Sequence, residues 1–184
     1  MKKTFVVSSI LALALSVGFA KPYSIDTTHS AVNFQVTHML ISDVDGAFNK
    51  FTGTIDFDED NKTLTALEGE VEIQSVDTKN ESRDKHLNAP DFFDSKKYPN
   101  AKLVMKSFKD NKLTADVTTR GITKPVVFDT VIKGPVQNTM TKKQIIALKL
   151  EGKINRKDFK VGSSTANAAV SDEVLIRIQI EASE

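Results

Sequence analysis

Residues 146–154 read Ile-Ala-Leu-Lys-Leu-Glu-Gly-Lys-Ile, and apolar side chains alternate with charged or small ones along the whole stretch. Because successive side chains of a β-strand point to opposite faces, this period of two predicts a strand with one buried face. Seven further runs share the period, at residues 31–38, 51–57, 67–73, 101–106, 113–117, 126–132 and 174–180. The sequence therefore predicts eight strands.

Short polar segments between these runs predict hairpins. Asp58–Asn61 and Lys109–Lys112 each separate two alternating runs. Residues 122–125 are expected to form another turn, with Pro125 where the next strand begins. Hairpins in succession predict an up-and-down meander.

One segment, between Ser75 and Asn100, interrupts the meander. Thr78-Lys79-Asn80-Glu81 matches a capping box, with Thr78 at the start of a short helix and Glu81 three residues later. Residues 90–94 are expected to add a further helical turn before Tyr98-Pro99 ends it. No other part of the sequence has a helical period.

One short helix cannot cover the apolar face of eight strands, so the sheet is expected to close on itself. The fold class is then all-β, an extended eight-stranded antiparallel barrel with one short helical insertion. The last run, residues 172–182, extends roughly 36 Å at ~3.3 Å per residue, which predicts a long, narrow barrel. An outer-membrane barrel shows the same alternation. Trp is absent, Tyr occurs twice, and no aromatic girdle is evident, which favours an apolar interior.

The first residues have the pattern of a cleavable signal peptide. Lys2 and Lys3 precede an apolar run at residues 5–15, and small residues lead to a cut after Ala20. We expect residues 1–20 to be removed and residues 21–184 to form one domain. The chain has no Cys, which excludes disulfides and thiolate sites and favours a bacterial periplasm. Its formal net charge is +1, and its charged residues are scattered along the sequence without a basic cluster. Nucleic acid is therefore not an expected partner.

An eight-stranded barrel is either filled by its side chains or holds one small ligand. Glycines at inward positions, Gly53, Gly69 and Gly152, suit a cavity and equally suit strand bends. The period of two leaves both alternatives open.

Six segments, in order, resemble the successive motifs of the YceI family: Tyr23–Ser30, Arg83–Leu87, Asp91–Asp94, Tyr98–Pro99, Arg120–Val126 and Asn155–Phe159. The resemblance implies a lipocalin-like periplasmic barrel that binds a polyisoprenoid or fatty-acid-like molecule in an apolar bore. Dimers are known in the family, so a homodimer is a candidate assembly. Lys160 stands where the family usually has Gly, which puts the local loop in question.

An amphipathic ligand with an anionic head needs a guanidinium or similar donor, and its tail needs hydrocarbon walls. Arg120 and Arg156 are the candidate donors, with a structural ion pair or a turn contact as the alternative for each. The resemblance implies head-group or structural contacts for His29, His38 and His86, and Phe92 and Phe93 are expected to narrow the mouth. The other predicted lining residues are Phe34, Val36, Phe57, Leu103, Phe128, Leu148 and Ile178.

The sequence predicts no metal site and no catalytic site. His29, His38 and His86 could hold zinc, but they lack close spacing. Ser, His and Asp are present without a nucleophile elbow or a phosphate-binding loop. We therefore expect no cofactor, no metal and no enzyme. The predicted function is transport, storage or sequestration of an apolar ligand without stable membrane insertion. The alternatives are a stress-related structural or interaction barrel with a filled core, and a small lipid-modifying enzyme.

Overall fold

The computed structural model describes residues 20–184, so the predicted signal peptide lies outside the described residues except for Ala20. The strands are β1 (Lys21–Ile25), β2 (Ala31–His38), β3 (Ser42–Phe48), β4 (Phe51–Asp58), β5 (Thr63–Glu72), β6 (Val76–Asp77), β7 (Asn100–Lys109), β8 (Lys112–Thr119), β9 (Ile122–Gln137), β10 (Gln144–Asn155) and β11 (Glu173–Ser183). The helical elements are η1 (Ile73–Ser75), α1 (Glu81–Leu87) and η2 (Arg156–Phe159). Within residues 20–184, no helix is long and apolar enough to span a bilayer.

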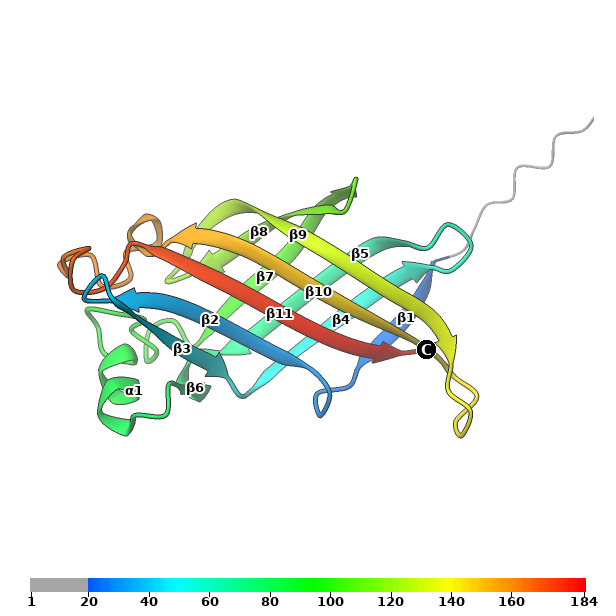
Figure 1. Ribbon diagram of the computed structural model, residues 1–184, viewed down its shortest axis with the longest axis horizontal. Coiled ribbons are helices and arrows are strands. Elements are labelled where there is room, and N and C mark those ends of the chain that lie inside the picture. Colours follow the sequence, from blue (N-terminus) through cyan, green and yellow to red (C-terminus); the bar gives the residue numbers. More distant parts are fainter. Residues whose placement is uncertain (1–19) are drawn as a thin grey trace, which may run out of the picture.

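The predicted closed antiparallel barrel of eight strands is confirmed. Its ring runs β1-β4-β5-β7-β8-β9-β10-β11 and closes where β1 pairs again with β11. β2 pairs with β11 beyond β1, at Leu175–Gln179, and continues into β3 and β6. Figure 1 shows the result as a long barrel whose strands are strongly tilted.

The composition of the ring corrects the sequence interpretation. The alternating run at residues 31–38 is a strand, β2, but the closing strand is the five-residue β1, which sequence analysis missed. β3 was missed as well. The eleven-residue length predicted for the last strand is confirmed by β11.

Three local predictions were wrong. Asn80, and not Thr78, caps α1: its side chain accepts a hydrogen bond from Arg83 N, whereas the Thr78 hydroxyl binds Asp84. The turn before β9 consists of Arg120 and Gly121, both with positive φ, so residues 122–125 belong to the strand. Residues 90–94 form hydrogen-bonded turns and no helix.

The two ends of the barrel differ. Figure 1 places α1 and the loop before β11 at one end, and the C-terminus with the β9–β10 hairpin at the other. At the C-terminal end the interior is packed solid, with Phe57, Leu113, Ala115, Ile146 and Leu148 at most 1% exposed. The largest cluster of buried side chains therefore lies at this end, and two smaller clusters, around Phe34 and around Phe159, lie towards α1.

Phe57→Ala should lower the free energy of unfolding by about 3–5 kcal/mol, because the substitution leaves a cavity in this packed end. Val127→Ala, at a side chain that is 55% exposed, is the control and should change it by less than about 0.5 kcal/mol. Urea denaturation measures both values. Equal effects of the two substitutions would contradict the assignment of the core to this end.

Candidate functional site

Two cavities share the interior on the side of the packed core that faces α1. The inner cavity has a volume of about 130 Å³ and the outer one about 420 Å³. Phe48, Ala101, Val117, Ile154 and Ile176 line both, so the two cavities adjoin. The interior is thus partly filled and partly hollow, which resolves the alternative that the sequence left open.

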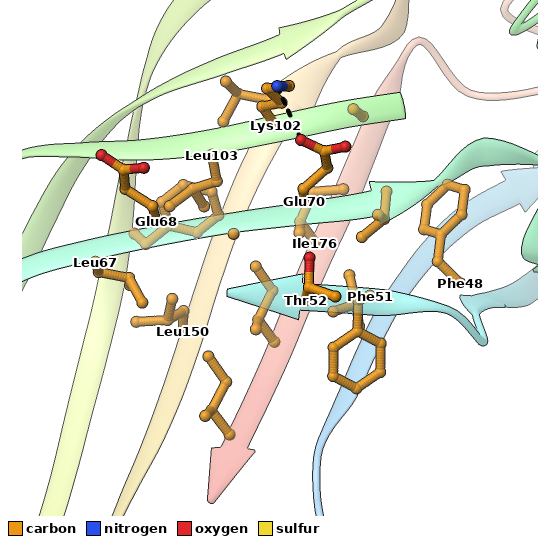
Figure 2. A pocket seen from close by; sticks show the side chains of 18 of the residues that line it. Phe48, Phe51, Thr52, Leu67, Glu68, Glu70, Lys102, Leu103, Leu150 and Ile176 are labelled. Atoms are coloured by element: carbon orange, nitrogen blue, oxygen red, sulfur yellow. Dashed lines mark ion pairs between the residues drawn. The ribbon is translucent and has the colours of Figure 1, made fainter. Parts of the chain in front are cut away.

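The inner cavity is apolar. Leu67, Leu103, Phe128, Leu150 and Ile178 are among its lining residues. Figure 2 shows that Glu68 and Glu70 leave β5 on the face opposite to Leu67, and that Glu70 pairs with Lys102. The N–O distance of that pair is 2.8 Å. The charges next to this cavity therefore lie on the outer face of the sheet, and hydrocarbon faces inward.

Glycines opposite phenylalanines shape the walls. A Cβ atom on Gly152 would lie 2.6 Å from the ring of Phe128, and one on Gly46 would lie 2.2 Å from the ring of Phe34. Each glycine is the direct cross-strand partner of its phenylalanine. Each ring therefore covers the backbone of the neighbouring strand, which the missing side chain makes accessible.

The outer cavity has an aromatic wall and a polar mouth. The ring centroids of Phe34 and Phe48 are 5.6 Å apart, and those of Phe48 and Phe93 are 5.9 Å apart. The exposed side chains of His38 and His86 also line this cavity, so it reaches the surface beside α1. His86 binds Asp91 at 2.9 Å and packs edge-on against Phe92.

No carboxylate is among the described residues that line the outer cavity, whereas Arg83 and Arg156 are. Arg83 stands on the half-buried side of α1, where its Nε donates to Thr78 Oγ1 at 2.7 Å and its Nη2 to Thr78 O at 2.6 Å. The other terminal nitrogen, Nη1, has no protein partner within residues 20–184. Arg83 was not among the site residues predicted from the sequence.

Arg156 lines the same cavity but is fully occupied by the protein. It is 4% exposed and donates to the carbonyl groups of Val161, Gly162, Thr165, Val170 and Ser171. Its Nη2 also pairs with Asp172 at 2.8 Å. This one side chain holds the loop that leads into β11, so the structure supports the alternative weighed for it, a structural contact.

Arg120 does not line either cavity. Its positive-φ turn directs the guanidinium to the carbonyl groups of Pro90 and Phe92, and the ring of Tyr98 lies 5.9 Å away. Gly121 also faces Tyr98, since a Cβ atom there would lie 3.1 Å from that ring. Arg120 therefore fastens the segment after α1 to the β8–β9 hairpin.

The remaining predicted lining residues divide between the cavities and the core. The outer cavity is lined by Phe34, Val36, His38, His86, Phe92, Phe93 and Arg156, and the inner one by Leu103, Phe128 and Ile178. Phe57 and Leu148 belong to the packed end and line neither cavity. The structure thus brings most of this group together in one interior space.

The three histidines are not brought together. His29 lies near the end of β11 that carries Glu181, whereas His38 lies near its beginning, bridged to Val170. Asp26, His29 and Glu181 have ligand atoms within 4.8 Å of one another; His29 is exposed and the two carboxylates are half-buried. The hydrogen bond that His29 Nδ1 donates to the Asp26 carboxylate raises the pKa of His29. Ser30 binds the backbone of Glu181 rather than His29.

Lys160 adopts a left-handed conformation, with φ of 58°, at the end of η2. Glycine takes this conformation at little cost, which accounts for the family preference at this position. The loop keeps its shape with lysine because Lys160 N binds Lys157 O at 3.0 Å and Arg156 holds the residues that follow.

Fold and site define a class of protein, an elongated eight-stranded barrel with an apolar interior cavity that opens beside a short helix. The chain belongs to the YceI family, because residues 23–182 match the model of the YceI-like domain. Protein YceI of Escherichia coli is 33% identical over 187 residues, covering 97% of each chain.

Solved structures agree in fold. The YceI protein of Campylobacter jejuni has a TM-score of 0.76 and 32% identity, and the match covers 98% of this chain and 99% of that one. A polyisoprenoid-binding domain from Saccharophagus degradans has a TM-score of 0.68 and 14% identity, covering 88% and 97%. At that identity the second likeness concerns the fold alone.

Arg156→Met should lower the free energy of unfolding by about 3–5 kcal/mol, because it leaves several carbonyl groups and Asp172 without their donor. It should also expose residues 160–172 to proteolysis. Lys157→Met is the control, since its pairing with Asp172 at 3.0 Å is partly exposed and contributes little. Thermal denaturation and limited proteolysis measure the effects. Unchanged stability in Arg156→Met would contradict the structural role.

Proposed function

We propose that this protein holds one amphipathic lipid, of the isoprenoid or fatty-acyl type, inside the barrel. The tail occupies the inner cavity and the apolar wall of the outer one, and an anionic head lies near Arg83 at the mouth. The observation that carries the proposal is the composition of the outer cavity, which combines an aromatic wall with two arginines and no carboxylate. A neutral head would gain a weaker hydrogen bond from that arrangement, and a cationic head would be repelled.

The energetics suit a hydrocarbon tail. Each buried methylene contributes about 0.8 kcal/mol before the cost of ordering the ligand is subtracted. Because Arg156 is saturated by carbonyl groups, Arg83 is the cation with a donor to spare. The proposed head contact is a charge-assisted hydrogen bond from Arg83 Nη1 to a carboxylate or phosphate oxygen.

The role that follows is carriage, storage or sequestration in the periplasm. The pattern of residues 1–20 supports export, and the absence of Cys suits that compartment. Binding without turnover is part of the proposal. The ligand class named for the Saccharophagus degradans domain is in line with it.

Native purification from a periplasmic extract, followed by lipid extraction and mass spectrometry, tests the proposal. We expect one lipid per chain and a mature N-terminus at Lys21. An unrelated periplasmic protein purified in the same way controls for carry-over. Absence of any lipid would favour the interaction barrel, and chemical conversion of added lipid would favour the enzyme; either result would overturn the proposal.

Arg83→Gln should weaken binding of palmitate about tenfold and leave binding of hexadecanol unchanged, because the lost bond is to a charged oxygen. Lys85→Gln, an exposed residue on the same helix, is the matched control and should bind both as the wild type does. Displacement of a fluorescent fatty acid measures the affinities. Equal loss for both ligands would show that Arg83 only supports the wall.

A further inference from the structure

The bore is blind at its inner end. Leu67, Phe128, Leu150 and Ile180 line the inner cavity and also belong to the packed core cluster. Beyond them the interior contains the fully buried side chains of the C-terminal end, such as Phe57 and Leu148. A tail that enters from the α1 end therefore meets a floor and has no second exit along the axis.

The depth of the bore follows from β11. Val174 lines the outer cavity, Ile176 both, and Ile178 and Ile180 the inner one, whereas Ala182 is fully buried and lines neither. The step from Val174 to Ile180 is ~20 Å along the strand, or ~15 Å along the axis of a barrel with the usual strand tilt. One leaflet of a bilayer has a hydrocarbon thickness of about 15 Å.

Gly69 differs from the other inward glycines. A Cβ atom on Gly53 would lie 2.5 Å from Glu68 O, and one on Gly152 would meet the ring of Phe128. At Gly69 the nearest atom would be Thr52 O at 3.9 Å, so a side chain there enters free space. Gly69 lines the inner cavity, and its backbone φ is not in the left-handed region.

We propose that the floor of the inner cavity limits the ligand to a single hydrocarbon tail about as long as one bilayer leaflet, and that the missing side chain of Gly69 sets this length. The inference rests on the proposed lipid-binding function and narrows its ligand class. Single-chain lipids of palmitate or geranylgeranyl length fill the bore. Longer tails leave their excess outside the apolar walls, and this excess adds no affinity.

Competition binding with tails of graded length tests the inference. The acyl series is laurate, palmitate and lignocerate, and the isoprenoid series is farnesol, geranylgeraniol and solanesol. For the wild type we expect affinity to rise from laurate to palmitate and from farnesol to geranylgeraniol, and then to stop rising. Each methylene buried adds about fourfold up to that limit, before ordering costs.

Gly69→Leu fills the inner cavity. It should weaken palmitate binding by about tenfold or more and laurate binding far less, because only the longer tail reaches the floor. Thr54→Leu places a leucine on the exposed outer face of the same hairpin and should leave both affinities unchanged. Urea denaturation of both variants verifies that the barrel is folded. Gly69→Ala should weaken palmitate binding less than Gly69→Leu does.

Two kinds of failure are distinguishable. If wild-type affinity keeps rising to lignocerate and solanesol, or if Gly69→Leu weakens all lengths equally, the length limit is wrong and the lipid-binding function stands. If the wild type binds no member of either series, the proposed function itself is overturned.

Discussion

The barrel depends on the backbone pairing of β11 on both of its edges. One edge pairs with β10 from Glu173 to Ser183 without interruption. The other edge is divided between β2, which takes Leu175–Gln179, and β1, which takes Ala182 and Ser183. Because both edges are occupied, the sheet has no open edge along β11 and its apolar face is enclosed. Without the short β1 contact the ring of strands would not close.

Enclosure alone does not decide what fills the interior; side-chain size does. At the C-terminal end large residues from opposite walls meet and exclude space, and Tyr23 joins them by donating a hydrogen bond to Glu59 at 2.9 Å. Burial raises the pKa of the Tyr23 hydroxyl, with the Glu59 hydrogen bond as the second cause. Towards α1, Gly46 and Gly152 have no side chain and the rings of Phe34 and Phe128 lie over their backbone, which leaves room in the interior. The same strands are therefore core at one end and cavity wall at the other.

Much of this fold could be predicted from the period of two, because a strand with one buried face alternates apolar and polar residues along its sequence. β1 escaped prediction because it has only five residues and contains Pro22, so its closing role comes from tertiary pairing. β3 does alternate, with Val44 and Phe48 facing inward, but Gly46 interrupts the apolar series. The pairing of Gly46 with the Phe34 ring is visible only in three dimensions.

The site was predictable in part. Alternation identifies the side chains that point into the barrel. It does not show at which level along the barrel axis the packed core ends and the cavity begins, so Phe57 and Leu148 were predicted to line the cavity. The roles of the arginines were harder to predict, because residue type does not reveal whether the N–H donors of a guanidinium are already bound by other protein groups. One signal for Arg83 was present: Arg83 and His86 are three residues apart on a short helix and therefore share a face.

The loop held by Arg156 and the strands of the barrel are stabilised by different kinds of hydrogen bond. The carbonyl groups of the loop bind the Arg156 side chain, and single backbone bonds join the loop to Thr37, Met39 and Asp91, so we expect it to open at a lower free energy than the continuous ladders of the barrel. We then expect amide hydrogens beside the mouth to exchange with solvent faster than those of the packed end. The mouth of the outer cavity would then rearrange while the barrel that gives the protein its stability stays folded.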